Sequence, residues 1–527
     1  MVFTVGLIMS YRMVFDAGSK ALKCAIADKN NEILAFESII PPVIQSTDGF
    51  GRNWDHSDYW ENLLILAKKT IKKSQINPEE IKFITTSIIR PSCVFTDEDF
   101  NPLYIGSSFD VQGIDYGDEI DESLEELTGK TLYEHTGHFP GFLMIPARLK
   151  FLDNNPSKIN NQKIKYYLPL DSWILVKFGG EVHTNYTSAM ESGFFSLEEK
   201  MWLDEWYSIF NIDEDFFPPT VLSGEIIGDI STEIQKQLNL NSDVELVAGI
   251  PDTQAALLAA NSITPGSISA ILGSTTPVQA VTKELYIDEK ERTWSSGIFV
   301  KNLCDFYIVE ANTGITGQVI KWAAHLFDAK MNSEFLEPSD KQYTQLNEKY
   351  QKFDEFEKTE PEENIISNSV YANLGPSTLT SSDRAAGEFY FPSPGGVEEF
   401  YIYQHQLVGA VFDNIMFAVS RNIDLATEVA RISDPSLTIL GGISRYTLLN
   451  QRFSDLYNLP IHYPRNPEST IEGLLILCDI AENKLQNLND YQTYIESKGN
   501  LKLLEPRLSM HSKLQEKYKK WMSITKI

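Results

Sequence analysis

Three segments of this 527-residue chain share one pattern, in which an apolar strand leads through a glycine-containing turn into a second strand or a helix. Residues 11–39 hold the first, and the pair Asn30–Asn31 adds a second turn, so we expect three short antiparallel strands there. Residues 267–281 repeat the hairpin, and residues 437–457 run from a strand into a helix. Two hairpins of one type, about 250 residues apart, indicate two related halves, and the mixture of strands and helices predicts an α/β protein.

Amphipathic helices are expected between these segments. Ser57 is a good N-cap residue for a helix that begins at Asp58, because the apolar residues that follow recur at helical spacing. A second helix is predicted over residues 315–327. Residues 332–364 are charged and polar, with apolar residues three or four apart, which fits either a partly exposed helix with an acidic tail or a helix that binds a partner.

The charge of the chain excludes two classes of partner. Its 73 acidic and 45 basic side chains give a net charge of -28. Nucleic-acid binding rests largely on clustered Lys and Arg, and anionic lipid attracts the same residues, so we expect neither partner. The four cysteines have no CxxC spacing, and no apolar run approaches the ~20 residues of a membrane span. We therefore expect a reduced, cytoplasmic, globular protein.

Glycine turns let backbone N–H groups approach an anion, and a neighbouring carboxylate can hold hydrated Mg²⁺. The chain has three such turns, which contain Asp16, Gly18 and Ser19; Gly273, Ser274 and Thr275; and Gly441, Gly442 and Ser444. The first two are candidate phosphate sites, and in the third a flat backbone leaves room for a ring or a ribose. Each signal is weak alone, but their joint appearance in this order is much less expected by chance.

Asp252 follows a buried strand and a Gly–Ile–Pro break, at the start of a helix rich in small residues. A carboxylate there can simply cap the helix N-terminus. It can equally act as a general base that orients and deprotonates a hydroxyl beside a metal-bound triphosphate, which is what phosphoryl transfer requires.

The order of these motifs resembles that of the FGGY carbohydrate kinases, which belong to the actin/Hsp70-like ATPase superfamily. Further landmarks at residues 54–60, 170–182, 451–460 and 468–473 agree, and the resemblance runs from about residue 12 to residue 485. Arg90 falls where glycerol kinases and autoinducer-2 kinases carry a substrate-binding Arg. The chain therefore looks closer to those members than to plain xylulokinases.

The resemblance implies ATP and Mg²⁺ as cofactors and a small sugar or polyol as substrate, and it leaves a homodimer open. Asp252 would be the catalytic base and would lie with Asp16 near the metal. The remaining cofactor-binding residues would be Gly18, Ser19, Lys23, Gly273, Ser274, Thr275, Gly441, Gly442 and Ser444. The sugar pocket would hold Arg90 and Asp252, with Asp110 close by and Trp54 at its edge.

The chain departs from the family pattern in ways that bear on activity and substrate. Lys20 replaces a threonine of the first phosphate loop, and it either meets a phosphate or points outward. Ile250 and Pro251 stiffen the backbone before the catalytic aspartate, and Ile443 replaces the third glycine of the adenosine loop. Pro91 stands where glycerol kinases carry a glutamate after the arginine.

We therefore expect an α/β fold with two actin-like (ribonuclease H-like) domains, whose mixed sheets are flanked by helices around a deep cleft. Residues 12–244 would form the sugar-binding domain, residues 245–485 the nucleotide-binding domain, and residues 486–527 a helical tail. The predicted reaction is ATP-dependent phosphorylation of a hydroxyl of a sugar, ketose or polyol. The alternative is a non-catalytic sugar or nucleotide sensor on the same fold, whereas a chaperone-like ATPase fits the sugar-kinase landmarks poorly. His135 and His138 lack metal-ligand spacing to a partner and are expected to be exposed.

Overall fold

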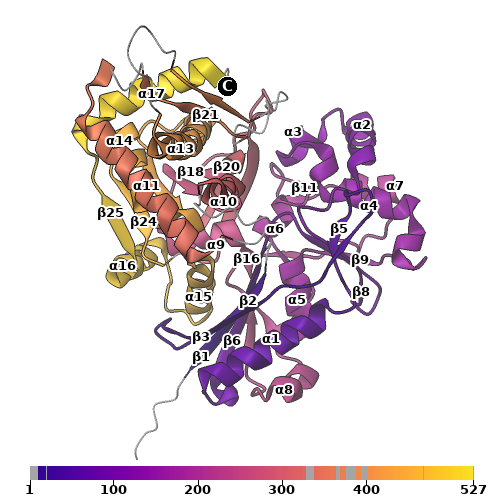
Figure 1. Cartoon of the computed structure of the whole chain (residues 1–527). Helices are drawn as coiled ribbons and strands as arrows, with labels where there is room; N and C mark the ends of the chain where they lie inside the picture. Colours follow the sequence, from indigo (N-terminus) through magenta and orange to yellow (C-terminus); the bar gives the residue numbers. More distant parts are fainter. Residues whose placement is uncertain are drawn as a thin grey trace, which may run out of the picture.

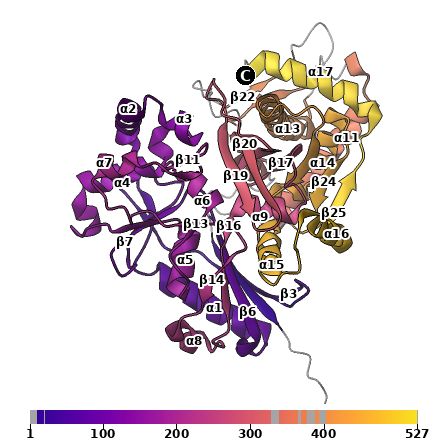
Figure 2. The same cartoon turned by 180° about the vertical axis from the view of Figure 1, so that it is seen from behind.

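The structure is a computed structural model, and it describes residues 10–18, 21–327, 338–363, 368–375, 387–392, 402–466 and 468–525. Ser19 and Lys20 lie outside these residues, as does the start of the segment 332–364. Two lobes lie side by side, an N-terminal lobe in indigo and purple and a C-terminal lobe in orange and yellow (Figures 1 and 2). The predicted α/β protein of two related domains is confirmed in this arrangement.

The N-terminal lobe contains a seven-stranded mixed sheet in the order β14-β15-β6-β1-β2-β3, with β16 also paired to β6. Its strands are β1 (Tyr11–Ala17), β2 (Leu22–Ala27), β3 (Ile33–Ile39), β6 (Ile81–Ile88), β14 (Ile226–Asp229), β15 (Glu245–Val247) and β16 (Ile250–Pro251). The three predicted strands of residues 11–39 are antiparallel neighbours, as expected.

The C-terminal lobe contains a second seven-stranded mixed sheet in the order β19-β20-β18-β17-β23-β24-β25. Its strands are β17 (Ser267–Ile271), β18 (Thr275–Thr282), β19 (Trp294–Val300), β20 (Cys304–Ile315), β23 (Ser436–Leu440), β24 (Ile461–Pro464) and β25 (Leu501–Leu504). The two sheets share a pairing pattern. β1 pairs antiparallel to β2 and parallel to β6, and β17 pairs antiparallel to β18 and parallel to β23. This common pattern confirms that the two halves are related.

A smaller five-stranded sheet in the order β4-β5-β8-β7-β9 completes the N-terminal lobe. Its strands are β4 (Val43–Gln45), β5 (Arg52–Trp54), β7 (Cys93–Thr96), β8 (Pro102–Gly106) and β9 (Tyr166–Leu168). Short two-stranded ladders join β10 (Thr184–Asn185) to β13 (Thr220–Val221), β11 (Phe195–Ser196) to β12 (Met201–Trp202), and β21 (Tyr371–Asn373) to β22 (Glu388–Tyr390).

Helices cover the sheets of both lobes. Those of the first half are α1 (Tyr59–Ser74), α2 (Gly117–Thr128), α3 (Leu132–Thr136), α4 (Ile145–Asn154), α5 (Leu170–Phe178), α6 (Tyr186–Met190), α7 (Glu205–Phe210), α8 (Thr232–Leu238) and α9 (Asp252–Ala259). Those of the second half are α10 (Gly317–Leu326), α11 (Asp340–Thr359), α13 (Gln404–Val429), α14 (Thr447–Tyr457), α15 (Ser469–Ala481), α16 (Leu488–Lys498) and α17 (Leu508–Thr525).

Side chains alternate between the two faces of β1, which ties the sequence of this strand to its packing. Met13 and Phe15 pack into the core beneath α1 and α5, whereas Val14 points to the opposite face. That face is covered by α9 and α15, which also bury residues of the second sheet such as Leu440. Helices α9 and α15 therefore lie between the two sheets and join the lobes through one shared core.

The structure corrects the predicted domain boundary at residues 244 and 245. Strands β15 and β16 pair with β6 inside the N-terminal sheet. The chain therefore leaves this sheet only after Pro251, because the apolar residues of 245–251 are needed to extend its parallel part.

The predicted helical tail is also wrong in one part. It contains α16 and α17, but between them β25 pairs antiparallel to β24 and forms the edge of the C-terminal sheet. Ser57 does not cap the first helix either, because its hydroxyl bonds to Asp55 while Asp58 occupies the N-cap position.

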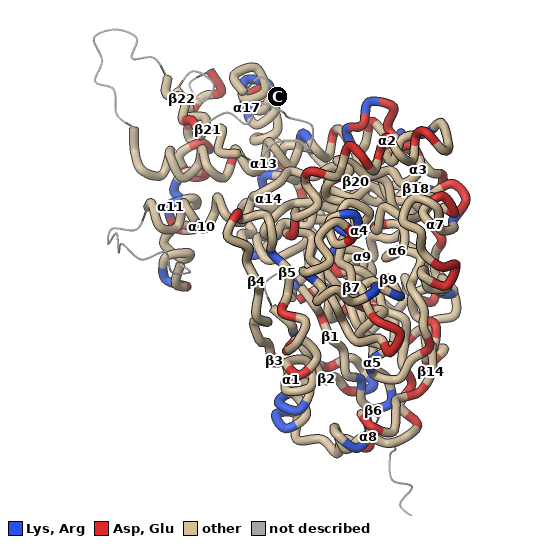
Figure 3. The backbone as a smooth tube through the Cα atoms, turned by 90° about the vertical axis from the view of Figure 1, so that its right-hand side faces the viewer, with Lys and Arg blue, Asp and Glu red and all other residues tan. Residues whose placement is uncertain are grey.

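The acidic residues are spread along the chain over both lobes rather than gathered in one place (Figure 3). They are dense on α2, whose sequence holds six Asp and Glu, and basic residues gather at the end of α1. Within the described residues, no helix combines the length and apolar character that a membrane crossing requires.

Candidate active site

Asp16 lies at the end of β1, where three strands converge. It is beside Lys23 of β2 and Ser87 of β6 in the strand register. The Ser87 hydroxyl donates to Asp16 Oδ1 over 3.0 Å, and Lys23 Nζ lies 3.4 Å from Oδ2. Burial raises the pKa of Asp16, and the charge of Lys23 offsets this rise only in part.

Asp252 is the first residue of α9, directly after β16. Because Ile250 pairs with Ser87, the same strand β6 connects Asp16 on one side to the start of α9 on the other. The backbone N–H of Thr253 donates to Asp252 Oδ1 over 2.7 Å. Burial, and next the charge of Asp16, raise the pKa of Asp252 to about 7, although Arg90 opposes the rise. A carboxyl group that titrates near neutrality can exchange a proton with a substrate hydroxyl.

Buried Asp16 and half-buried Asp252 both have raised pKa values, which favours a bound cation, and the two carboxylates fit Mg²⁺ in this respect. The described residues contain no group of three or more His, Cys, Asp or Glu that could hold a metal ion. In proteins Mg²⁺ is usually held by one or two carboxylates, with phosphate oxygens and water at its other positions.

Arg90 lies close by, beyond the end of β6. The backbone N–H of Ile89 donates to the carbonyl of Ala17 over 3.1 Å, which holds this segment beside the end of β1. The guanidinium of Arg90 pairs with Glu191 and with Glu310, and its side chain is only 8 % exposed. Glu191 follows α6 in the N-terminal lobe, whereas Glu310 lies in β20 of the C-terminal lobe. Arg90 therefore bridges the two lobes.

Amides and a histidine complete the surroundings of the two glutamates. Glu191 accepts hydrogen bonds from Gln254 Nε2 and contacts His138 Nε2, each over 3.3 Å. Gln279 Nε2 donates to Glu310 over 2.8 Å. We call the residues of this network the interlobe cluster: Arg90, His138, Glu191, Gln254, Gln279 and Glu310. Asp252, Thr253 and Gln254 are consecutive residues at the start of α9, so the cluster adjoins Asp252.

Charge pairing dominates the ionisation of the cluster. Burial disfavours the charged forms, yet the two carboxylates raise the pKa of Arg90. Although burial opposes it, the charge of Arg90 lowers the pKa of Glu191. Arg90 and Glu191 are therefore ionised at neutral pH.

The two remaining glycine loops lie next to each other in the C-terminal lobe. The backbone N–H of Leu272 donates to Leu440, and that of Ile443 donates back to Leu272, over 2.8 and 3.1 Å. Gly441 has φ +84°, and a Cβ there would lie 2.5 Å from the Leu272 carbonyl oxygen. This close approach requires glycine. The turn of residues 273–275 is thereby fixed beside the turn of residues 441–444.

The turn of residues 441–444 contains two glycines, and the free space around them differs. A Cβ on Gly442 would meet no atom within 4 Å, which agrees with an open position for a ring or ribose. The Ser444 hydroxyl donates to the Gly441 carbonyl over 2.7 Å and so stabilises the loop itself. Ser274 accepts from the N–H of Gly317, the first residue of α10, over 3.2 Å.

Of the other predicted site residues, only some lie beside Asp16 or Arg90. Lys23 lies near Asp16 and also pairs with Glu468 over 2.8 Å, so it bridges the two lobes. Trp54 is buried against Tyr59, and Asp110 is fully buried, where it accepts hydrogen bonds from Gln112. Neither is among the partners of Arg90 in the described residues, so their place in a sugar pocket stays a prediction. Ser19 lies outside the described residues.

Sequence reasoning missed the partners of Arg90. The expected exposure of His138 was wrong, because its ring is 1 % exposed, contacts Glu191 and packs against Trp294. His135 is half-buried and bonds to Thr128. One available signal was Glu310, an ionisable residue inside an apolar strand, since a buried charge needs a partner.

Comparison with known proteins shows which family the chain resembles. Residues 11–259 match the N-terminal domain of the FGGY family of carbohydrate kinases. Gluconokinase of Bacillus subtilis strain 168 is 22 % identical over 501 residues, which cover 93 % of this chain and 91 % of that protein.

Solved structures show the same fold over both lobes. Gluconate kinase from Lactobacillus acidophilus has a TM-score of 0.79 and 18 % identity. Plasmodium falciparum glycerol kinase with ADP has a TM-score of 0.78 and 16 % identity. Each comparison covers 98 % of both chains. The N-terminal half of the chain therefore matches the FGGY carbohydrate kinases in sequence, and the whole chain resembles them in fold, as the order of its motifs predicted.

Proposed function

We propose that this protein transfers the γ-phosphoryl group of ATP to a hydroxyl group of a sugar, ketose or polyol, with Asp252 as the general base. The observation that carries the proposal is Asp252 itself. It is a carboxyl group with a pKa of about 7, placed at a helix start between Asp16 and the interlobe cluster.

In this proposal the substrate hydroxyl lies against the Asp252 carboxylate, which accepts its proton as the oxygen attacks phosphorus. Asp16 and Asp252 would hold Mg²⁺, which supplies positive charge to the phosphate oxygens when it is bound. The turns at residues 273–275 and 441–444 would hold the phosphates and the adenosine. The chain binds these anions despite its net charge of -28, so local backbone N–H groups and the metal must outweigh the overall field.

The names of similar proteins support the coarse reaction. They include a gluconokinase and a glycerol kinase bound to ADP. The substitutions before Asp252 leave its carboxylate in place, which favours catalysis over the sensor alternative. Ile250 and Pro251 both pair with β6, so the two residues that depart from the family pattern extend the sheet up to the base.

The test is ADP release with a panel of pentuloses, polyols and linear hydroxyketones, measured for the wild type and for Asp252→Asn. We expect one or more acceptors to stimulate ADP release, and the variant to lose about 10²–10⁴-fold in kcat, the usual contribution of a general base. Asp340→Asn is the matched control, because Asp340 is also the first residue of a helix but is exposed. It should retain wild-type activity.

Two results would contradict the proposal. Wild-type protein that releases no ADP with any acceptor would favour a sensor. Unchanged turnover in Asp252→Asn would leave phosphoryl transfer standing but remove Asp252 as its base.

A further inference from the structure

We propose that the acceptor site selects an uncharged polyhydroxy substrate and rejects sugar acids, and that Glu310 is the residue that enforces this choice. The inference rests on the proposed function, because it concerns the hydroxyl-bearing substrate of the same site.

The first step is the state of Arg90. An arginine near a substrate site is the usual partner for a carboxylate, because its planar fork pairs with two oxygens at once. Here both sides of that fork are already occupied by Glu191 and Glu310, and the side chain is 8 % exposed. A substrate carboxylate would have to displace one of these glutamates, which would leave a buried negative charge without its partner.

The second step is the balance of charge. The groups that surround the site hold two cations and five carboxylates: Lys23 and Arg90, and Asp16, Glu191, Asp252, Glu310 and Glu468. One magnesium ion would offset part of this excess, but it would be engaged by the nucleotide. An aldonate would therefore add a further negative charge to a region where negative charge is already in excess, at a low local dielectric.

The third step is hydrogen-bonding character. Arg90 and the amide N–H groups of the cluster already donate to Glu191 and Glu310, which leaves the amide oxygen of Gln279 as an acceptor without a donor. That amide oxygen is buried and has no hydrogen-bond partner within the described residues. Hydroxyl groups donate hydrogen bonds to such atoms, whereas an ionised carboxylate only accepts them. The site therefore complements a polyol or a neutral ketose.

Glu310 is the discriminating residue because of its place in the fold. It comes from β20 of the C-terminal lobe, whereas Arg90 and Glu191 both come from the N-terminal lobe. Removing its charge would weaken the pairing on one side of the Arg90 guanidinium while Glu191 keeps the arginine in position. This differs from substrate selection in the similar proteins named for gluconate, whose substrate carries a carboxylate.

The experiment compares two matched ligand pairs, xylitol with xylonate and sorbitol with gluconate, in which a carboxylate replaces a terminal CH₂OH. For the wild type we expect the neutral member of each pair to be at least tenfold better in kcat/KM, or in affinity measured by calorimetry. In Glu310→Gln this ratio should fall by about tenfold or more toward the acid, because Arg90 loses one of its two charged partners and a substrate carboxylate can compete with the weaker amide contact. Glu310→Gln keeps the shape of the side chain, and circular dichroism checks its fold.

Glu482→Gln is the control. Glu482 also pairs with an arginine of the opposite lobe, Arg12, over 2.5 Å, but away from Arg90. It should leave the preference unchanged. Equal use of acid and neutral ligand by the wild type, or an unchanged ratio in Glu310→Gln, would overturn the inference while phosphoryl transfer stands. If no ligand stimulates ADP release, phosphoryl transfer fails instead, and the calorimetric affinities alone then decide: a preference for the neutral ligands supports the inference, and equal affinities overturn it.

Discussion

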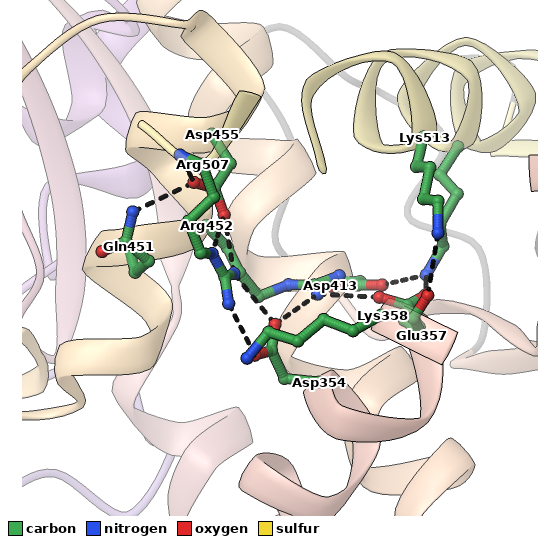
Figure 4. A network of polar contacts seen from close by, with 10 residues as sticks. Asp354, Glu357, Lys358, Asp413, Gln451, Arg452, Asp455, Arg507 and Lys513 are labelled. Atoms are coloured by element: carbon green, nitrogen blue, oxygen red, sulfur yellow. Dashed lines mark hydrogen bonds and ion pairs between the residues drawn. The ribbon is translucent and has the colours of Figure 1, made fainter. Parts of the chain in front are cut away.

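Two buried networks of charged residues in this protein differ in one respect, the balance of their charges. The first is the interlobe cluster together with Asp16, Lys23, Asp252 and Glu468. The second lies within the C-terminal lobe, where residues of α11, α13, α14 and the α17 region meet (Figure 4). We call it the C-terminal cluster, and it consists of Asp354, Glu357, Lys358, Asp413, Arg452, Asp455, Arg507 and Lys517.

The charges of the C-terminal cluster balance one another. Its four cations face four carboxylates, and fully buried Arg452 contacts Glu357 and Asp413 over 2.7 and 2.8 Å. The site network instead has three more carboxylates than cations, and one of them, Asp252, has a pKa of about 7. A balanced buried network needs no further ligand and serves packing. An unbalanced one is completed only by a cation or by donors from a substrate, which is typical of functional sites.

The largest effect is expected from breaking the balanced network. Lys517 of α17 is 1 % exposed and pairs with Glu357 and Asp413. Lys517→Met should lower the free energy of unfolding by about 3–5 kcal/mol, because it leaves two buried carboxylates without this partner. Urea denaturation measures the loss.

Lys519→Met is the matched control in the same helix. Lys519 is exposed and pairs only with Glu516 among the described contacts, so this variant should change stability by less than about 1 kcal/mol. Equal losses in the two variants would show that α17 is stabilised by its apolar face and not by its buried charge.

A smaller effect is expected in the unbalanced network from Arg90→Lys. Lysine keeps the positive charge but not the fork that pairs with Glu191 and Glu310 together. Misplacement near the reacting groups should lower kcat/KM on the order of 10–100-fold. Stability should fall less than in Lys517→Met, since the charge remains.

Arg292→Lys controls for the general cost of replacing such an arginine. Arg292 also contacts two carboxylates, Asp288 and Glu428, but lies in neither network. It should retain wild-type kcat/KM. If Arg90→Lys retained it too, the interlobe cluster would be a structural bridge only, and the contrast between the two networks would disappear.

The same contrast separates what the sequence predicts from what it does not. Asp16, Asp252 and the glycine loops lie at the ends of strands and the start of a helix, so local pattern was enough to identify them. Glu191 and Glu310 are 119 positions apart in the chain, and they meet at Arg90 only because the two lobes pack together. A local sequence pattern holds no information on contacts between the lobes. It also gave the wrong exposure for His138, because a turn with glycine is usually exposed, whereas this turn lies against Glu191 in the interior.

The domain boundary failed for a related physical reason. The residues before Asp252 have the composition of any buried strand, and composition does not show which of two similar sheets a strand joins. Their pairing with β6 shows that they belong to the N-terminal sheet. The two-lobed fold was predictable because both halves repeat one hairpin pattern, but β25 was not, since a four-residue edge strand carries little signal beside two helices.

The last expected effect is a pH dependence of stability that only the unbalanced network shows between pH 5 and pH 8. The pKa of Asp252 is about 7 in the folded protein and about 4 when the chain is unfolded. Its proton therefore stabilises the fold fully below pH ~4, and that stabilisation is lost as pH rises through about 7. Asp354 in the C-terminal cluster behaves in the opposite way: despite burial, Arg507 and Arg452 lower its pKa to about 2. Its contribution is present above pH ~4 and constant from pH 5 to 8.

Asp252→Asn behaves as a permanently uncharged Asp252, so it should unfold at higher urea than the wild type at pH 8 and at the same urea at pH 4. The gain at pH 8 is expected to be about 1–4 kcal/mol. The wild-type kcat/KM should fall as the pH drops below about 7, while the wild-type fold becomes more stable over the same interval. These opposite trends arise because one carboxylate must be ionised to act as a base and is destabilising when ionised without a cation. Saturating Mg²⁺ and ATP should shrink the gain at pH 8, and a gain that is equal at pH 4 and pH 8 would show that charge at Asp252 is not its cause.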